Sequence, residues 1–240
     1  MKRIAALAVV AVVLTGCSTV ESKDIRTSGM TANLVVSLPE GTDAADVSAS
    51  LRVGTLTFVE LGSDESITAS GGGKDVELKH HRAAGVTDYA NRLDGVVDPG
   101  TEIAFNLKRG GDDDSAPRST VKLPERVHLV APPAGATYSR RSAIAVRFDS
   151  APSQLPSILT WAGGCVQEGS LELEPGRTTA TIPRGAIKQV TATPTPGQDL
   201  SRCQVRLTVT RRTEGRLDPA FKNGSVTAES QSAREISSVP

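Results

Sequence analysis

The sequence predicts an all-β protein: two tandem antiparallel β-sandwich domains that follow a signal peptide and a flexible tether. Apolar and polar residues alternate in many short segments from residue 32 onward, as in half-buried strands. Glycine and proline turns separate these segments at regular intervals. Apolar spacing of three and four, the mark of an amphipathic helix, is not convincing after the first 16 residues. Many short strands with regular turns are typical of antiparallel sandwiches.

The first 16 residues are predicted to be a signal peptide. Lys2 and Arg3 form a basic head, and the run from Ile4 to Leu14 has no polar side chain. A basic head before a short apolar core is typical of a secretory signal, and this run is too short to span a membrane as a helix.

The stretch Leu14-Thr15-Gly16-Cys17 resembles the lipobox of bacterial lipoproteins. The resemblance implies cleavage before Cys17, a diacylglycerol on its thiol and a fatty-acyl chain such as palmitate on its new amino group. Two or more acyl chains hold a protein stably on a membrane. Because Ser18 follows, and not the aspartate of an inner-membrane retention signal, the resemblance implies sorting to the outer membrane where one exists. Otherwise the location is the outer face of the plasma membrane.

Residues 17–30 are predicted to be a lipidated flexible tether, because they are polar and show no periodicity. A coil of this length spans about 20 Å, which would hold the first domain clear of the lipid headgroups.

Composition limits the function. Without residues 1–16 the chain has 25 basic and 27 acidic side chains, a formal charge of −2. Nucleic-acid binders need an electropositive surface, so nucleic acid is not an expected partner.

Four segments alternate most clearly and are predicted as strands: Leu34 to Leu38, Ile103 to Leu107, Ile144 to Phe148 and Val205 to Val209. Shorter strands are expected at 51–61, 75–79, 87–93, 119–123, 171–173 and 178–182. Residues 44–51 are expected to form a short helical turn or a strand. Leu217 and Phe221 are expected to pack inward from a turn.

The domain boundary is predicted near Pro124, which gives a first sandwich at 31–124 and a second at 125–240. The segment Val127 to Gly135, an apolar strand followed by a proline pair and a glycine, is similar to the opening of bacterial immunoglobulin-like modules. Antibody-type domains have a tryptophan after their first cysteine, whereas here Trp161 precedes Cys165. That detail is therefore not carried over, and Trp161 is expected in the core.

Cys165 and Cys203 are predicted to form a disulfide in the second domain, as an even pair in an exported chain. They lie 38 positions apart, and closing such a loop stabilises by about 4 kcal/mol in the chain-entropy account. A metal pair or two free thiols are the alternatives.

No catalytic residue and no cofactor are predicted, since nucleophile-elbow and metalloprotease motifs are missing. Asp112, Asp113 and Asp114 are weak calcium candidates, for which a hydrated hairpin loop is the simpler interpretation. The paired arginines at 140–141 and 211–212 could meet anionic groups if they cluster. A hydrolase would instead need a pocket that joins a histidine to a carboxylate, the candidates being His80, His81, His128, Asp88, Asp94 and Asp98.

The predicted function is that of a membrane-anchored cell-envelope lipoprotein, a non-catalytic binding or scaffolding module. An envelope protein is the expected partner besides the membrane, and an edge strand could pair with an extended partner segment. An envelope hydrolase and a calcium-stabilised structural module are the alternatives.

Overall fold

The structure, a computed structural model, describes residues 18–83, 86–110, 115–148, 153–190 and 201–240. Within these ranges the chain is built almost wholly of β-strands, joined by turns, with two short 3-10 turns near the beginning. The predicted all-β class is therefore confirmed.

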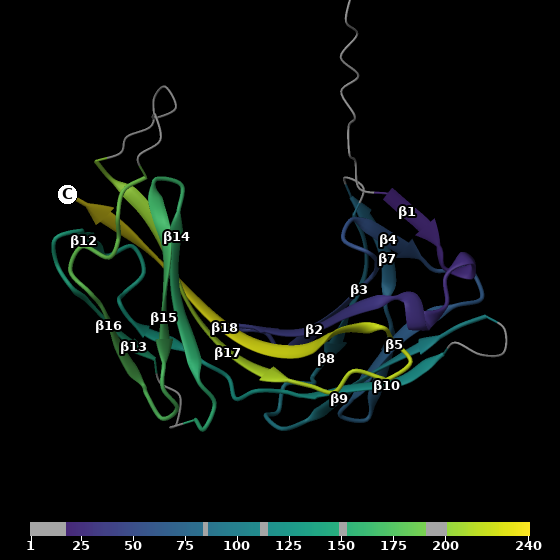
Figure 1. Cartoon of the computed structure of the whole chain (residues 1–240). Helices are drawn as coiled ribbons and strands as arrows, with labels where there is room; N and C mark the ends of the chain where they lie inside the picture. Colours follow the sequence, from purple (N-terminus) through teal and green to yellow (C-terminus); the bar gives the residue numbers. More distant parts are fainter. Residues whose placement is uncertain (1–17, 84–85, 111–114, 149–152, 191–200) are drawn as a thin grey trace, which may run out of the picture.

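One long sheet runs through the whole molecule (Figure 1). Its main path, in spatial order, is β1 (Ser18–Glu21), β4 (Thr57–Glu60), β3 (Ala44–Val53), β2 (Thr31–Pro39), β18 (Asn223–Val239), β17 (Cys203–Glu214), β14 (Ser157–Gly163) and β15 (Val166–Leu173). Three more strands join beside this path: β8 (Val86–Asp94) on β3, β7 (Lys79–Ala83) on β8, and β12 (Thr137–Ser139) on β18.

Two smaller sheets pack against the long one, one at each end. The first is β10 (Ala116–Lys122), β9 (Glu102–Lys108), β5 (Ser66–Gly71) and β6 (Lys74–Glu77). The second is β11 (Leu129–Ala131), β13 (Ile144–Phe148) and β16 (Thr179–Ile182). Each pairing of a small sheet with part of the long sheet encloses a separate apolar core, so the molecule has two lobes.

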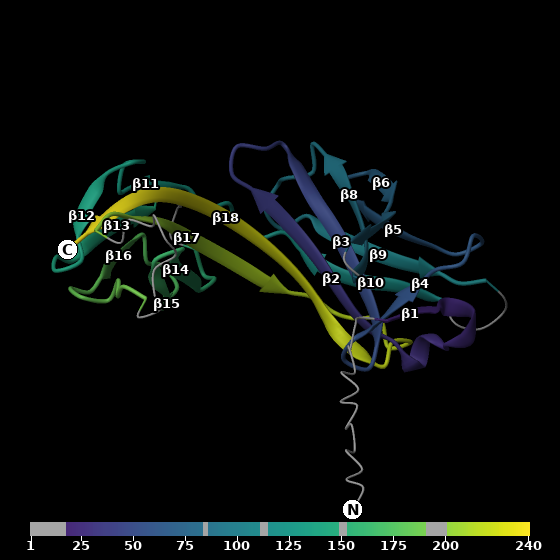
Figure 2. The same ribbon diagram turned by 90° about the horizontal axis from the view of Figure 1, so that it is seen from above.

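β18 connects the two lobes in one unbroken strand of 17 residues. It pairs with β2 in parallel over Asn223–Gln231 and with β17 in the antiparallel sense over Thr227–Ser238. Figures 1 and 2 show it as the curved yellow ribbon between the lobes. From Val226 to Ile236 its buried side chains are all at even positions, namely Val226, Ala228, Ser230, Ser232 and Ile236, and at its end Ser237 and Ser238 are both buried. Both cores therefore lie on the same face of the long sheet.

The strands predicted from alternation are confirmed. The apolar members of all four strong segments are buried, and polar neighbours such as Asn106 and Arg206 are exposed. Residues 44–51 form strand β3 and not a helical turn, whereas 51–61 is split between β3 and β4 by a turn at Gly54. Phe221 is buried and Leu217 packs against the same core, as expected.

A flexible tether is expected over residues 17–30, but residues 18–30 form ordered elements. Ser18–Glu21 is strand β1, which pairs in parallel with β4, and two 3-10 turns follow, η1 (Ser22–Asp24) and η2 (Thr27–Gly29). Ser22, Thr27 and Met30 are buried. Two of the polar side chains that suggested a coil, Ser22 and Thr27, instead take part in a buried hydrogen-bond network.

The domain boundary at 124–125 stays a prediction. The apolar core of the first lobe includes Phe221, Val226 and Ala228 from the C-terminal part of the chain. The second lobe's core begins with Val127 and Leu129 and extends to Ile236.

Candidate functional site

The face of the long sheet opposite the two cores has no second layer among the described residues. Alternation places the odd-numbered side chains of β2 and β18 and the even-numbered side chains of β14 and β17 on this face. Apart from Ser237, which is buried, they are half-buried or exposed over both lobes, and we call this surface the open face.

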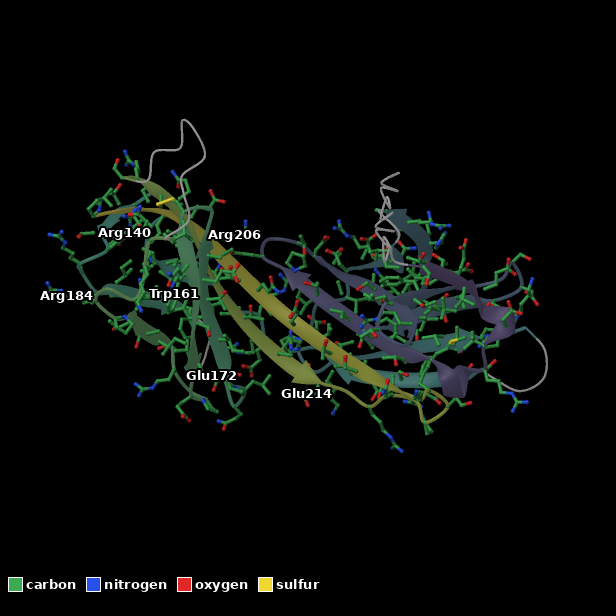
Figure 3. The ribbon with its side chains drawn as sticks, turned by 45° about the horizontal axis from the view of Figure 1, so that its top comes forward. Arg140, Trp161, Glu172, Arg184, Arg206 and Glu214 are labelled. Carbon is green, nitrogen blue, oxygen red and sulfur yellow. A yellow bond between two sulfur atoms is a disulfide. The ribbon has the colours of Figure 1, made fainter. Side chains whose placement is uncertain are left out.

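A groove of about 660 Å³ lies on the open face beside the second lobe. Strand β14 contributes Ile158 and Thr160, and Ile158 is 42% exposed. The other lining residues are Pro156, Thr210, Arg212, Glu214, Glu229 and Gln231. Figure 3 shows Arg206 and Glu214 toward opposite ends of β17.

The polar side of the groove is ordered by side-chain pairing across β17 and β18. Arg212 Nη2 lies 3.2 Å from Glu229 Oε2, and Gln231 Nε2 donates to Glu229 Oε1 at 2.8 Å. The groove thus joins one exposed apolar side chain to hydroxyl, amide and paired charged groups. An apolar centre with a polar rim suits contact with a polypeptide segment.

The junction between the lobes is held by polar contacts on the other face of β18. Ser230 Oγ accepts from the Val127 N–H at 3.0 Å, and Ser232 Oγ accepts from the Leu129 N–H at 2.7 Å. Arg126 donates to the carbonyls of Pro39 and Thr42 in the β2–β3 turn. The segment leading to the second lobe is therefore tied to both β18 and the first lobe.

Glu40, in the same turn, adds charged contacts to this junction. It pairs with His128 Nδ1, accepts from Ser232 Oγ at 2.7 Å and lies 3.8 Å from Arg234. The structure thus gives His128 a carboxylate partner that links the lobes.

The N-terminal segment is clamped by a buried ion pair. Arg109 Nε lies 2.5 Å from Glu65 Oε1, and both side chains are only 5% exposed. The Arg109 guanidinium also donates to Thr27 Oγ1 and to the carbonyls of Ser22 and Ile25. Burial raises the pKa of Glu65, but hydrogen bonds from Ser22, Arg109 and the Gly62 N–H lower it by more, and its net shift is downward.

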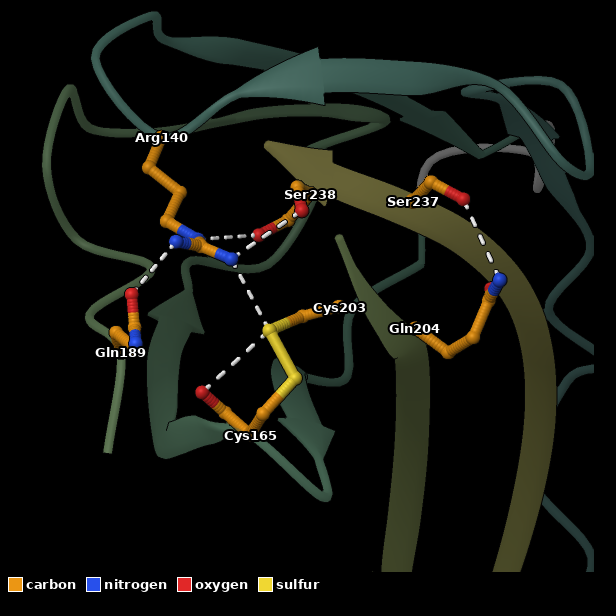
Figure 4. The surroundings of a disulfide bond; sticks show 7 residues. All are labelled: Arg140, Cys165, Gln189, Cys203, Gln204, Ser237 and Ser238. Atoms are coloured by element: carbon orange, nitrogen blue, oxygen red, sulfur yellow. Dashed lines mark hydrogen bonds between the residues drawn. A yellow bond between two sulfur atoms is a disulfide. The ribbon is translucent and has the colours of Figure 1, made fainter. Parts of the chain in front are cut away.

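The predicted disulfide between Cys165 and Cys203 is present, with the two Cα atoms 5.8 Å apart (Figure 4). Arg140 lies over it, with Nη2 3.0 Å from Cys203 Sγ and further donations to Ser238 Oγ and Gln189 Oε1. Trp161 is in the core of the same lobe, as expected, and Gly169 leaves room for its ring.

The paired arginines do not cluster. Arg211 is buried and donates to the carbonyls of Glu125 and Arg126, and burial lowers its pKa although Glu125 opposes the shift. Arg140 is beside Cys203. Cys203 lies eight residues before Arg211 along β17, a separation of about 26 Å in a strand. The expectation that the two arginine pairs form a shared anion site is therefore wrong.

The histidine and carboxylate candidates lie on different elements. His80 and His81 are on the exposed strand β7, where His80 stacks obliquely on Tyr89 at 5.5 Å and His81 is opposite Asp88. His128 is at the lobe junction. Cys17 and Asp112, Asp113 and Asp114 lie outside the described residues.

No cluster of three or more histidine, cysteine, aspartate or glutamate side chains in the described part of the chain could hold a metal ion. Among those same residues, no helix has the length and apolar character to cross a membrane.

No protein-family model matches the sequence, and no curated protein matches it. Solved structures with a similar arrangement include a cytokine receptor complex, at 10% identity and TM-score 0.31, covering 83% of this chain and 94% of the other. A two-domain fibronectin type-III segment of chicken tenascin has 12% identity and TM-score 0.23, covering 82% and 96%. Fibronectin(III)-like modules of Clostridium thermocellum CbhA have 9% identity and TM-score 0.26, covering 88% and 93%. At such scores these similarities carry no argument about function.

Proposed function

We propose that the protein is a lipid-anchored, non-catalytic binding module of the cell envelope, which holds a protein partner on its open face. The observation that carries the proposal is the uncovered face itself, which extends over two lobes fixed to each other by β18. A rigid surface with an exposed apolar side chain is suited to binding, because little order is lost when a partner docks.

Anchoring is proposed from the first 17 residues, where a basic head, an apolar core and the sequence Leu14-Thr15-Gly16-Cys17 occur in order. The acyl chains on Cys17 would hold the chain at the outer membrane where the cell has one. The disulfide between Cys165 and Cys203 supports an oxidising compartment, where such bonds persist.

The groove is the proposed centre of partner binding. Ile158 would contact an apolar side chain of the partner, and Arg212 and Glu229 would exchange part of their mutual pairing for groups on the partner. An extended segment could pair alternatively with β15, which is at the edge of the long sheet next to β14.

Site-specific photo-crosslinking in intact envelopes tests this proposal. A photoreactive side chain at Ile158 is expected to form one discrete crosslinked species, and Arg212→Glu in the same chain is expected to reduce its yield at least fivefold. A photoreactive side chain at Arg184, exposed on the second lobe away from the groove, is the matched control. Equal crosslinking from both positions, or none from Ile158, would contradict the proposal.

A further inference from the structure

Three large apolar side chains are exposed in the described part of the chain: Leu56 at 55%, Ile158 at 42% and Val86 at 41%. Ile158 belongs to the groove. Leu56 and Val86 both lie at the end of the first lobe where the described chain begins, and this location points to what they contact.

Leu56 is adjacent to the first described residue. Strand β1 pairs with β4 from Ser18↔Thr57 onward, and the Ser18 N–H donates to the Leu56 carbonyl at 3.3 Å. Leu56 is in the tight turn that joins β3 to β4, beside Gly54 and Thr55. The turn therefore projects from the same end of the sheet as the N-terminal segment.

Val86 is level with that turn. β3 and β8 pair with a register that runs from Ala44↔Asp94 to Ala49↔Tyr89. The pairing ends there, and Phe58 of β4 takes the position opposite Arg52. β8 continues beside β4: Arg82, opposite Thr87, lies 3.6 Å from Glu60, and Val86 follows as the partner of Ala83. Figure 1 shows β1, β4 and β7 together in this part of the lobe.

The neighbouring edge strand β7 is basic and exposed along its length, with the sequence Lys79-His80-His81-Arg82-Ala83. Two carboxylates lie beside it: Glu60, 3.6 Å from Arg82, and Asp88, opposite His81. Lys79 has neither as its direct partner. Basic side chains next to exposed apolar ones are the combination that binds an anionic bilayer surface.

The contacts of Arg109 hold the chain in place only a few residues after the proposed anchor at residue 17. The Arg109 guanidinium fixes the Ser22 and Ile25 carbonyls to the body of the lobe, and β1 continues directly from there to Ser18. Consecutive Cα atoms are about 3.8 Å apart, so acyl chains on residue 17 would enter the bilayer beside Leu56.

We infer that this end of the first lobe, formed by Ser18, Leu56, Val86 and β7, lies on the anionic lipid headgroups, with Leu56 and Val86 inserted. We call it the membrane-facing end. The inference rests on the proposed lipid anchor and adds to it the orientation of the first lobe. This lobe contacts the bilayer directly and is not held away from it by a tether.

The test uses the mature chain, residues 17–240, which contains every described contact. Cys17→Ser with six histidines in front of residue 17 is bound to phosphatidylglycerol vesicles through a nickel-chelating lipid, so that attachment does not depend on acylation. Thr55→Cys, next to Leu56, then carries an environment-sensitive fluorophore, because Cys165 and Cys203 are bonded to each other. Glu172→Cys, exposed on the second lobe, is the matched control.

Nitroxide-labelled lipid is expected to quench the fluorophore at position 55 at least twofold and to leave the one at position 172 unchanged. Leu56→Ser with Val86→Ser is expected to abolish the quenching at 55 without loss of vesicle attachment. Equal quenching at 55 and 172, or quenching that survives the double substitution, would overturn the inference.

Mass spectrometry of native full-length protein, run in parallel, reports acylation of Cys17. Acylated protein without quenching at 55 would reject the membrane-facing end and keep the anchor. Quenching at 55 with unmodified Cys17 would reject the anchor and keep the lipid-binding property of this end.

Discussion

Arg109 shows how much of the N-terminal structure depends on one side chain. Its guanidinium is buried with Glu65 and reaches Thr27 and the carbonyls of Ser22 and Ile25. A buried cation is tolerated only when it is paired and hydrogen-bonded, and every one of these contacts satisfies that condition. The residues it holds come from two separate parts of the chain, 22–27 and 65, which explains why a polar segment is ordered.

Replacement of Arg109 by methionine is expected to destabilise the protein by about 3 kcal/mol, because Glu65 would remain buried without its cation. Urea unfolding measures the loss, and hydrogen exchange is expected to show faster exchange of residues 18–30. Arg118→Gln removes an exposed pair with Glu102, and its expected cost is below about 1 kcal/mol. Equal costs for the two variants would refute a structural role of the clamp.

The ionisation of Glu65 predicts a pH dependence. Its pKa is lower in the folded protein than in the unfolded chain, so the unfolded chain takes up the proton first as pH falls. The stability that Glu65 provides is thus complete at neutral pH and is lost as pH falls through the lowered pKa. Melting curves of the wild type and Glu65→Gln should differ at pH 7 and converge below the ordinary glutamic acid range. A gap that is constant with pH would contradict this explanation.

At the scale of elements, β18 determines the architecture. It is the longest strand of the described residues, it pairs with β2 and β17, and its buried face serves both cores and the junction. Its central buried positions are Ser230 and Ser232, whose hydroxyls accept from the backbone of the connecting segment. An apolar residue there would leave two buried N–H groups without acceptors.

Gly224 is paired with Ala32 near the start of the β2–β18 ladder. Its φ is +140°, and a Cβ built there would lie 1.8 Å from the Ala32 carbonyl oxygen. Gly224→Ala is therefore expected to break the first pairs of the β2–β18 ladder and to cost more than about 2 kcal/mol. Gly176 is also at positive φ but has open space around it. In the same unfolding assay, Gly176→Ala therefore measures the cost of the backbone conformation alone, without the clash of a Cβ atom. A smaller loss at 224 than at 176 would show that the close approach is not limiting.

The disulfide is expected to stabilise the second lobe. Cys165→Ala with Cys203→Ala opens a loop with a separation of 38 residues, and the expected loss is about 4 kcal/mol. Calorimetry should show a lower melting temperature, mainly in the transition that exposes Trp161. Tryptophan fluorescence identifies which transition that is. A loss below about 1 kcal/mol would indicate that the Arg140 network alone holds this end together.

At the scale of the whole molecule, the two lobes are fixed by a shared sheet and not by a linker. β18 runs through both, and the polar junction at Arg126, Glu40 and His128 lies beside it. A continuous sheet resists bending because its ladder hydrogen bonds would have to break. The open face is therefore one surface with a fixed curvature, as the proposed function requires.

Small-angle scattering tests this rigidity. Arg126→Ala removes two donations to the β2–β3 turn but leaves the sheet intact. Its scattering profile is expected to match that of the wild type, with a modest loss of stability of about 1–2 kcal/mol. Expansion of the particle in this variant would mean that side-chain contacts, and not β18, set the arrangement of the lobes.

The strand pattern, the disulfide and the core position of Trp161 could be predicted from the sequence. Each depends on local signals: period-two alternation at positions such as Val205 to Val209, turn residues, and an even pair of cysteines. The signal for β18 was missed, because serines occupy its central buried positions and alternation of apolar residues is interrupted there.

The order of residues 18–30, the shared sheet of the two lobes and the open face became apparent only in the folded chain. In each case the stabilising partner is distant in the chain: Arg109 for Ser22, Val127 for Ser230, Asn223–Gln231 for β2. From sequence alone, a polar side chain is interpreted as solvent-exposed, because its hydrogen-bond partner is not known. Only the folded chain brings such partners within hydrogen-bond distance.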